Sequence, residues 1–155
     1  SYDYLWINLR VKGGAYGCMS GFGRSGEGYL VSYRDPNLKE TNDIYEGIPA
    51  YLENFEADER TMTKYVIGTI GAMDTPFTPA DQGARGLSAY LSGVTDEMMQ
   101  EERDQVLAAT QKDIQNLAGI VKAILKTGAL CAIGNEEKVE ENREMFGEVK
   151  NLFRA

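Results

Sequence analysis

The sequence predicts an α+β fold in which an antiparallel hairpin and one further short strand pack against a helical layer. Through most of the chain, apolar residues recur at the three- and four-residue spacing of amphipathic helices. Two short apolar segments flank a glycine-rich stretch, which is typical of a β-hairpin. The apolar run Ala129–Ile133 is typical of a buried strand. Because 155 residues suffice for one core, we expect a single domain, 1–155.

The first predicted elements are a helix over residues 2–12 and the hairpin that follows it. Gly13 is expected to end the helix in a left-handed cap, because glycine has no Cβ to clash there. The strands are expected over Ala15–Phe22 and Tyr29–Arg34, with a turn over Gly23–Gly28. The chain therefore turns a sharp corner between its first helix and its first strand.

The rest of the chain is predicted to be helical, with boundaries set by proline, glycine and capping residues. A helix begins near Leu38 and breaks at Gly47–Pro49, because proline cannot continue the backbone hydrogen bonds of a helix. A closing helix is expected over residues 136–153. The residues expected to start the helices between them are Asp58, Thr78, Thr95 and Thr110, the last in a capping box with Asp113.

Composition excludes several classes of function. The net charge of −8 argues against a nucleic-acid surface, and no apolar run approaches the roughly 18 residues of a membrane span. The chain has no histidine, so it cannot supply a histidine-based catalytic triad or a His-x-x-Glu-His zinc motif. Cys18 and Cys131 lie in apolar stretches and are expected to be buried, reduced thiols.

Gly21–Gly26 matches the glycine spacing of a dinucleotide-binding loop. That function needs a strand before the motif and a helix after it, so that the pyrophosphate meets a helix N-terminus. Here the apolar stretch Tyr29–Val31 follows, which indicates a strand. We therefore interpret the motif as a hairpin turn and keep a nucleotide-binding module as the weaker alternative.

Acidic residues gather at the start of the predicted closing helix. Negative charge in a first helical turn is stabilised by the helix dipole, so the cluster needs no function. Its spacing does not match a calcium-binding loop, and we predict no metal ligands in it. The residues are Glu136, Glu137, Glu140 and Glu141.

The corner at Arg10–Gly17 combines the end of a helix, two adjacent glycines and a tyrosine at the start of a strand. Arg10 can be a solvated cation near a helix C-terminus, and Tyr16 can be an aromatic residue packed on the sheet. The functional alternative is that the corner turns both side chains toward one cleft. A guanidinium binds carbonyl and carboxylate oxygens, and a phenol can donate to a developing oxyanion.

Six segments, in order along nearly the whole chain, resemble the C-terminal domain of the pitrilysin/insulinase family of zinc peptidases. The likeness is strongest to the presequence-protease branch. The segments are Leu9–Gly17, Ser32–Asn37, Lys64–Ile70, Asp74–Pro76, Tyr90–Thr95 and Ala132–Lys138.

The resemblance implies a much longer enzyme with two halves, each of two related α+β domains, that close around a chamber. It places the zinc and its inverted His-x-x-Glu-His motif in the first domain, which agrees with the absence of histidine here. It implies that an arginine and a tyrosine at this corner reach the substrate near the scissile bond. These are Arg10 and Tyr16, Tyr16 being the catalytic contact to the carbonyl, with Gly13 and Gly14 letting the backbone approach the peptide.

The sequence starts at Ser1 inside a predicted helix, and the strands that precede this helix in the family are missing. We therefore expect a C-terminal domain fragment of a zinc metalloendopeptidase that degrades unstructured peptides. The expected partners are peptides and the N-terminal half, which supplies zinc, with no nucleic acid and no membrane. We expect the fragment alone to be inactive and zinc-free, and the enzyme to be cytoplasmic in bacteria or in an organelle matrix in eukaryotes. The alternative is a non-catalytic scaffold or peptide-binding subunit of the same superfamily.

Overall fold

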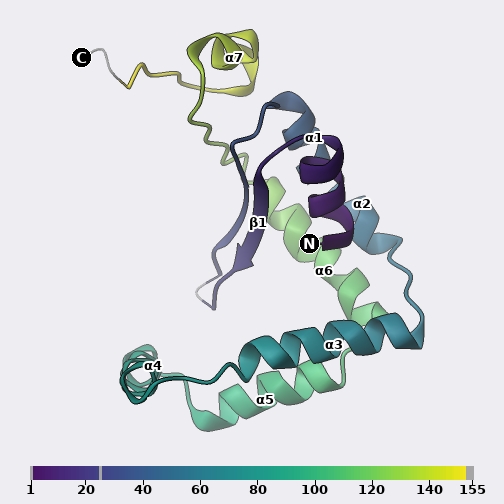
Figure 1. Ribbon diagram of the computed structural model, residues 1–155, viewed down its shortest axis with the longest axis vertical. Coiled ribbons are helices and arrows are strands. Elements are labelled where there is room, and N and C mark those ends of the chain that lie inside the picture. Colours follow the sequence, from purple (N-terminus) through teal and green to yellow (C-terminus); the bar gives the residue numbers. More distant parts are fainter. Residues whose placement is uncertain (1, 25, 153–155) are drawn as a thin grey trace. The chain divides into compact units, whose positions relative to one another are not determined.

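The computed structural model describes residues 2–24 and 26–152 and has the predicted α+β architecture (Figure 1). In the described part, one helix precedes a single two-stranded antiparallel sheet, and the remaining helices follow it. The chain divides into two compact units. The first consists of residues 1–54 and 116–155, and the second of residues 55–115.

The first unit begins with the predicted helix and hairpin. Helix η1 (Tyr2–Lys12) has the wide turns of a π-helix. Strands β1 (Gly17–Phe22) and β2 (Gly28–Tyr33) pair antiparallel, with Gly17 opposite Tyr33 and Phe22 opposite Gly28. Both elements confirm the prediction from the sequence.

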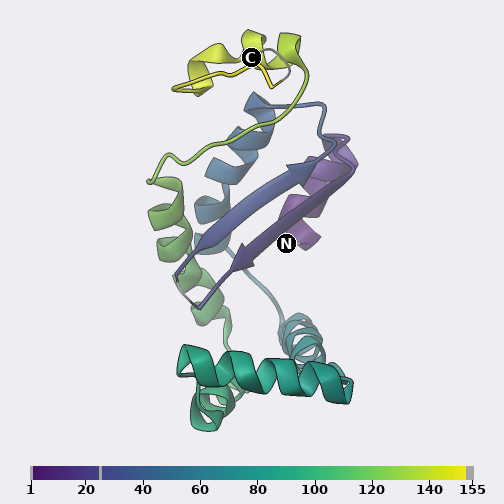
Figure 2. The same cartoon turned by 90° about the vertical axis from the view of Figure 1, so that its left-hand side faces the viewer.

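Helices α1 (Lys39–Glu46) and α2 (Ile48–Glu53), together with the C-terminal part of α6 (Gln111–Leu125), lie on one side of the hairpin (Figure 2). The predicted break falls at Gly47, where α1 ends and α2 starts. The break follows from the proline in the first turn of α2, which has no backbone N–H to donate to α1.

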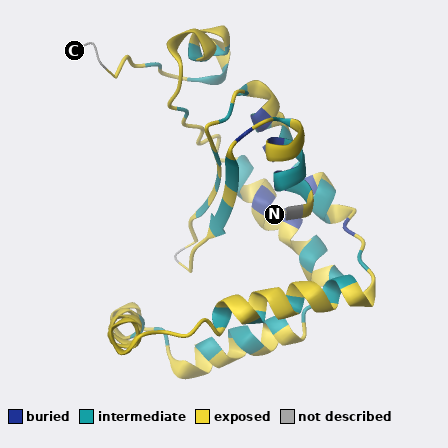
Figure 3. Cartoon of the chain, viewed as in Figure 1, coloured by how far each residue is buried: buried dark blue, intermediate teal, exposed yellow. Residues whose placement is uncertain are grey.

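The core of the first unit lies between η1 and these helices, where the buried positions gather (Figure 3). Leu9 is the most deeply buried side chain, with 1% of its surface exposed. Leu30 and Cys18 pack against this core from the inner face of the hairpin. The buried members of the cluster are Leu5, Leu9, Ala15, Tyr45, Ile48 and Val121.

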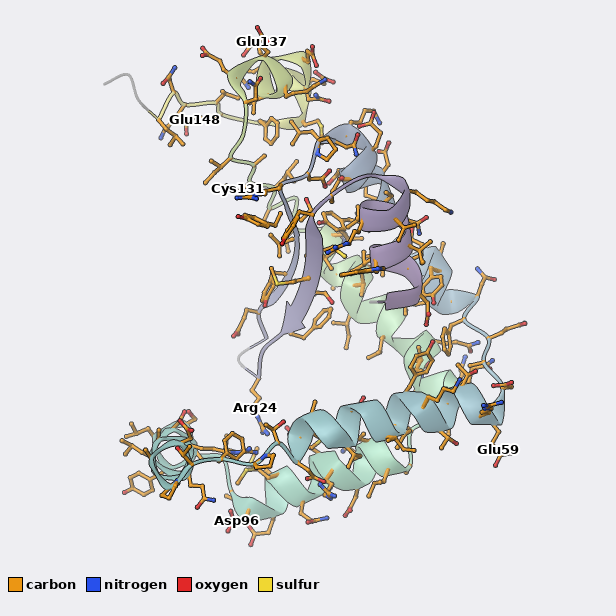
Figure 4. The ribbon with its side chains drawn as sticks, in the orientation of Figure 1. Arg24, Glu59, Asp96, Cys131, Glu137 and Glu148 are labelled. Carbon is orange, nitrogen blue, oxygen red and sulfur yellow. The ribbon has the colours of Figure 1, made fainter. Side chains whose placement is uncertain are left out.

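The second unit is helical, and its helices start at the predicted caps. Helix α3 (Glu59–Met73) begins after Asp58, whose carboxylate accepts a hydrogen bond from the Thr61 N–H at 2.8 Å. Hydrogen bonds from the Thr61 side chain and backbone hold the pKa of Asp58 below its usual value. Helices α4 (Pro79–Ser92) and α5 (Asp96–Leu107) start after capping threonines. In Figure 4, the labelled Glu59 and Asp96 mark the starts of α3 and α5.

Two further contacts define the second unit. Arg103 of α5 forms a two-pronged ion pair with Asp74, the residue that ends α3. The predicted capping box at the start of α6 is confirmed, since the Thr110 N–H donates to Asp113 at 2.8 Å. The sequence therefore locates these helix ends correctly because each end has a specific hydrogen-bonding partner.

The predicted strand over Ala129–Ile133 is wrong. This segment has no strand pairing in the described part of the chain and forms the link between α6 and α7 (Glu136–Glu141). Cys131, labelled in Figure 4, is exposed instead of buried, and Ile133 is 81% exposed. An apolar run becomes a strand only when a neighbouring strand pairs with its backbone, and no such strand lies beside it within residues 2–24 and 26–152.

The predicted closing helix over residues 136–153 is correct only at its start, and residue 153 lies outside the described residues. Helix α7 is followed by a single helical turn, η2 (Arg143–Met145), and the backbone is extended at Phe146. None of the described residues after α7 is buried. Amphipathic spacing stabilises a helix only when its apolar face packs against something, and here that packing is missing.

Leu9→Ala is expected to lower the free energy of unfolding by about 2–5 kcal/mol, because it leaves a cavity at the most buried position of the core. Urea denaturation followed by fluorescence of Trp6, the single tryptophan, measures the effect. Val11→Ala on the same helix is the control, since Val11 is 63% exposed and its change should stay within about 0.5 kcal/mol. Equal effects of the two substitutions would contradict the core described above.

Candidate functional site

Two loops of the first unit meet at the corner between η1 and β1. The Asn37 side-chain amide donates to the Gly13 carbonyl at 2.7 Å, which ties the loop after β2 to the end of η1. Asp35 fixes the second loop, because its carboxylate accepts hydrogen bonds from the Asn37 N–H at 2.9 Å and from the Thr41 hydroxyl at 2.7 Å. The structure thus brings together the Leu9–Gly17 and Ser32–Asn37 segments.

Backbone hydrogen bonds close the end of η1. The Gly13 N–H donates to the Asn8 carbonyl at 3.0 Å, and the Gly14 N–H donates to the Arg10 carbonyl at 3.1 Å. The Ala15 N–H donates to the Leu9 carbonyl at 2.9 Å, and Ala15 itself is 3% exposed. The corner is therefore anchored to the core immediately before Tyr16.

The two glycines of the corner have different roles, and the left-handed one is Gly14 instead of the expected Gly13. Gly14 has a φ of 81°, which L-residues with a Cβ rarely adopt. Gly13 is needed for space, since a Cβ there would lie 2.7 Å from the Leu9 carbonyl oxygen. The left-handed cap lies one residue later than predicted because η1 ends with wide π-type turns.

Arg10 lies between two aromatic rings at this corner. Its Nη1 donates to the Tyr16 carbonyl at 2.5 Å. Its guanidinium carbon lies 4.3 Å from the centre of the Trp6 ring and 5.5 Å from that of Tyr16. Cation–π contacts of this kind hold an arginine in place without neutralising its charge. The structure thus joins the two residues that the sequence singled out.

Tyr16 is 60% exposed, yet it is held from several sides. Its N–H is shared between the carbonyls of Tyr33, at 3.1 Å, and Arg34, at 3.3 Å. Its ring meets the Tyr33 ring edge to face at 5.9 Å between centres. The Arg34 guanidinium carbon lies 5.7 Å from the Tyr16 ring and 5.4 Å from the Tyr33 ring.

Sequence reasoning missed three members of this cluster: Trp6, Tyr33 and Arg34. Trp6 looks like an ordinary residue of the apolar helical face, and Tyr33 like an ordinary strand aromatic. Arg34 has a φ of 48°, and it is the one non-glycine residue with positive φ in the described ranges. No sequence pattern marks an arginine for this conformation, so only its place beside the Asp35–Asn37 turn could have drawn attention to it.

The cluster has the chemistry of an oxygen-binding site. Within residues 2–24 and 26–152, no carboxylate forms an ion pair with Arg10 or Arg34, so both keep their positive charge. The exposed phenol of Tyr16 adds a neutral hydrogen-bond donor beside them. Such a set binds carbonyl or carboxylate oxygens.

Cys18, which lies two residues after Tyr16 in β1, has a different environment. It packs against the core, and burial raises the pKa of its thiol. A raised pKa keeps the sulfur protonated near neutral pH, and the thiolate is the reactive form of cysteine. Cys18 is therefore a packing residue of the hairpin.

The glycine-rich segment Gly21–Gly26 forms the hairpin turn, apart from residue 25, which lies outside the described residues. The Gly23 N–H donates to the Glu27 carbonyl at 2.8 Å, and the Gly26 N–H donates to the Gly23 carbonyl at 3.1 Å. Strand β2 follows directly. The helix that a dinucleotide-binding loop requires is absent from this place, so the interpretation as a turn is confirmed.

The described residues contain neither a metal-binding cluster nor a membrane-spanning helix. In these ranges no group of three or more histidine, cysteine, aspartate or glutamate side chains is arranged to hold a metal ion. No helix among them is both long enough and apolar enough to cross a bilayer. Of the four glutamates predicted to be first-turn charges, Glu136 and Glu137 lie in the first turn of α7. Glu140 and Glu141 lie at its end, where the helix dipole does not favour them and Lys138 pairs with Glu141 at 2.9 Å.

The family of this chain follows from its match to a known family model. A family model described as the PreP C-terminal domain matches residues 1–136. This match covers most of the chain and includes both loops of the corner. The chain belongs to the PreP C-terminal domain family, and so to a presequence-protease-like group of peptidases.

Individual relatives cover nearly the whole chain. The chain is 47% identical over 153 residues to "Protein HypA" of Clostridium perfringens, an alignment that covers 99% of this chain and 16% of that protein. It is 38% identical over 157 residues to "Presequence protease 1, chloroplastic/mitochondrial" of Arabidopsis thaliana, an alignment that covers 99% of this chain and 14% of that protein. It is 32% identical over 116 residues to "Presequence protease, mitochondrial" of Danio rerio, an alignment that covers 75% of this chain and 11% of that protein. The chain thus spans less than a fifth of these relatives.

Gly14→Ala is expected to lower the free energy of unfolding by about 1–2 kcal/mol, because the left-handed conformation strains any residue with a Cβ. Gly17→Ala is the matched control, since its added Cβ would have no heavy atom within 4 Å and its φ is not positive. Thermal or urea unfolding of both variants measures the difference. If Gly14→Ala proved as stable as Gly17→Ala, the assigned cap would be wrong.

Proposed function

We propose that this chain is the substrate-engaging C-terminal domain of a zinc metalloendopeptidase that degrades unstructured peptides. The observation that carries the proposal is the pairing of Arg10 with Tyr16 at an exposed corner, in a chain of the PreP C-terminal domain family. Relatives that carry the name presequence protease support proteolysis as the reaction of the intact protein.

Arg10 orients the peptide in this proposal. Its guanidinium has five N–H donors, and one of them is used by the Tyr16 carbonyl. The Trp6 and Tyr16 rings fix its plane. A fixed planar cation can bind a peptide carbonyl in one geometry, so the bound chain is positioned before the reaction.

Tyr16 is the catalytic residue in this proposal. Its exposed phenol donates a hydrogen bond to the oxygen of the scissile carbonyl, which gains negative charge in the transition state. The neighbouring Arg10 guanidinium favours the same charge. Gly13 and Gly14 lack side chains beside it, which lets the peptide backbone approach closely.

The zinc of such an enzyme does not fit the residues of this chain. The sequence has no histidine, and the described residues contain no group of carboxylates and thiols arranged for a metal. We propose that the N-terminal half of the intact protein holds the zinc. The roles assigned here to Arg10 and Tyr16 concern only substrate oxygens and need no metal ligand from this segment.

The proposed partners are unstructured peptides and the N-terminal half of the same protein, with no nucleic acid and no membrane. The acidic composition supports the first exclusion, because a chain of net charge −8 repels phosphates. The Arabidopsis and Danio relatives are named for mitochondria or chloroplasts. We propose an organelle matrix for a eukaryotic source and the cytoplasm for a bacterial one.

The second candidate is a non-catalytic scaffold or peptide-binding subunit of the same superfamily. The same corner could bind a peptide carbonyl without assisting its cleavage, since positioning alone needs no metal. The sequence of the N-terminal half separates the two candidates. A His-x-x-Glu-His motif there supports the enzyme, and its absence supports the binding subunit.

Tyr16→Phe in the full-length protein is expected to lower kcat roughly 10- to 1000-fold, the range for loss of one oxyanion donor. The ring stays, so its stacking and the fold are retained. Steady-state cleavage of an unstructured fluorogenic peptide measures the change. Tyr90→Phe is the control, because Tyr90 is 82% exposed on α4 and lies outside the corner. Unchanged turnover of Tyr16→Phe would argue against the catalytic role.

The isolated 155-residue chain is expected to cleave no peptide and to bind no zinc at the affinity of a structural site. The reason is that its own side chains lack the ligand set that zinc requires. Peptide cleavage assays and metal analysis after dialysis test both statements. Stoichiometric zinc, or cleavage that a chelator abolishes, would contradict them.

A further inference from the structure

We infer that Arg34 is a positioning residue for Tyr16, so that the site contains a second cation besides Arg10. This inference rests on the proposed function, because it assigns Arg34 to the step in which the Tyr16 phenol meets the substrate. Neither the family match nor the names of the relatives assign a role to this residue.

Arg34 contacts Tyr16 through both its backbone and its side chain. The Arg34 carbonyl accepts a hydrogen bond from the Tyr16 N–H at 3.3 Å. Its guanidinium lies over the Tyr16 ring at 5.7 Å and over the Tyr33 ring at 5.4 Å. Since these two rings also meet edge to face, one cation holds the pair together.

An exposed tyrosine needs such support to have one conformation. A side chain that is 60% exposed has few packing neighbours and can populate several rotamers. Catalytic groups act through geometry, and a displacement of about 1 Å can cost on the order of 100-fold in rate. Contacts that select one rotamer therefore matter more for turnover than for the stability of the fold.

The backbone of Arg34 indicates that its side chain has a use. A φ of 48° is strained for arginine, and glycine would adopt it without strain. No carboxylate in the described ranges forms an ion pair with this guanidinium, so a salt bridge does not explain the arginine. Among the residues that the structure describes, its guanidinium lies over the Tyr16 and Tyr33 rings.

The first test is Arg34→Asn in the full-length protein. Asparagine tolerates the left-handed conformation, so the loop should keep its shape while the cation is lost. We expect kcat to fall about 10-fold, with KM changed less than about twofold, because a positioning residue acts on the reaction step. Unchanged kcat would overturn the inference, and so would a higher KM at constant kcat.

A second variant separates positioning from damage to the fold. Arg34→Gly should unfold at the same temperature as the wild type or above it, because glycine removes the backbone strain. It should nevertheless lose kcat to the same extent as Arg34→Asn. Arg85→Asn is the matched control, because it removes a cation–π contact, to Phe77 at 4.9 Å, outside the corner. If Arg34→Gly kept full turnover, or Arg85→Asn lost as much as Arg34→Asn, the inference would be wrong.

A double-mutant cycle with Tyr16→Phe gives the decisive measurement. If Arg34 acts through the Tyr16 hydroxyl, Arg34→Asn should lower kcat less than about twofold once that hydroxyl is gone. An equal fall in both backgrounds would show that Arg34 acts independently of Tyr16, and the inference would fail. The proposed function fails separately, when Tyr16→Phe alone leaves kcat unchanged.

Discussion

The structure of the corner depends on the burial of Leu9. Its side chain fills the core of the first unit, and its carbonyl accepts the hydrogen bond of the Ala15 N–H at 2.9 Å. One residue thus fixes η1 against α1 and α2 and also closes the turn that leads to Tyr16. Arg10, the next residue, is exposed for the same reason, since neighbouring residues on a helix point in different directions.

Most helix ends and the hairpin could be predicted from the sequence because local chemistry decides them. Asp58 and Thr110 each have a specific hydrogen-bonding partner within three residues, and the turn after Phe22 is set by glycines. The errors occur where packing decides. Ala129–Ile133 needs a partner strand, and residues 142–152 need a surface on which to pack. Neither requirement can be read from periodicity.

The candidate site could likewise be predicted from the sequence only in part. Arg10 and Tyr16 could be found because they flank a helix end with two glycines and because the surrounding segments resemble a known family. Tyr33 and Arg34 could not, because they reach Tyr16 only when β2 returns beside β1 and places residue 33 opposite residue 17. Trp6 was missed although it lies four residues before Arg10 on the same helix, a local spacing that the sequence does contain. The left-handed backbone of Arg34 is a tertiary feature as well, set by the turn that Asp35 and Asn37 hold.

The way the cations are held explains how an acidic chain can offer a positive site. Elsewhere several cationic side chains form ion pairs, as Lys39 does with Asp43 at 3.0 Å, and such pairs compensate charge. At the corner, aromatic faces take the place of the carboxylates and leave the charge uncancelled. Under the proposed function, a peptide oxygen that gains negative charge during cleavage meets the Arg10 guanidinium, whose charge no ion pair among the described residues compensates. The aromatic contacts are therefore part of the electrostatics of the site as well as of its packing.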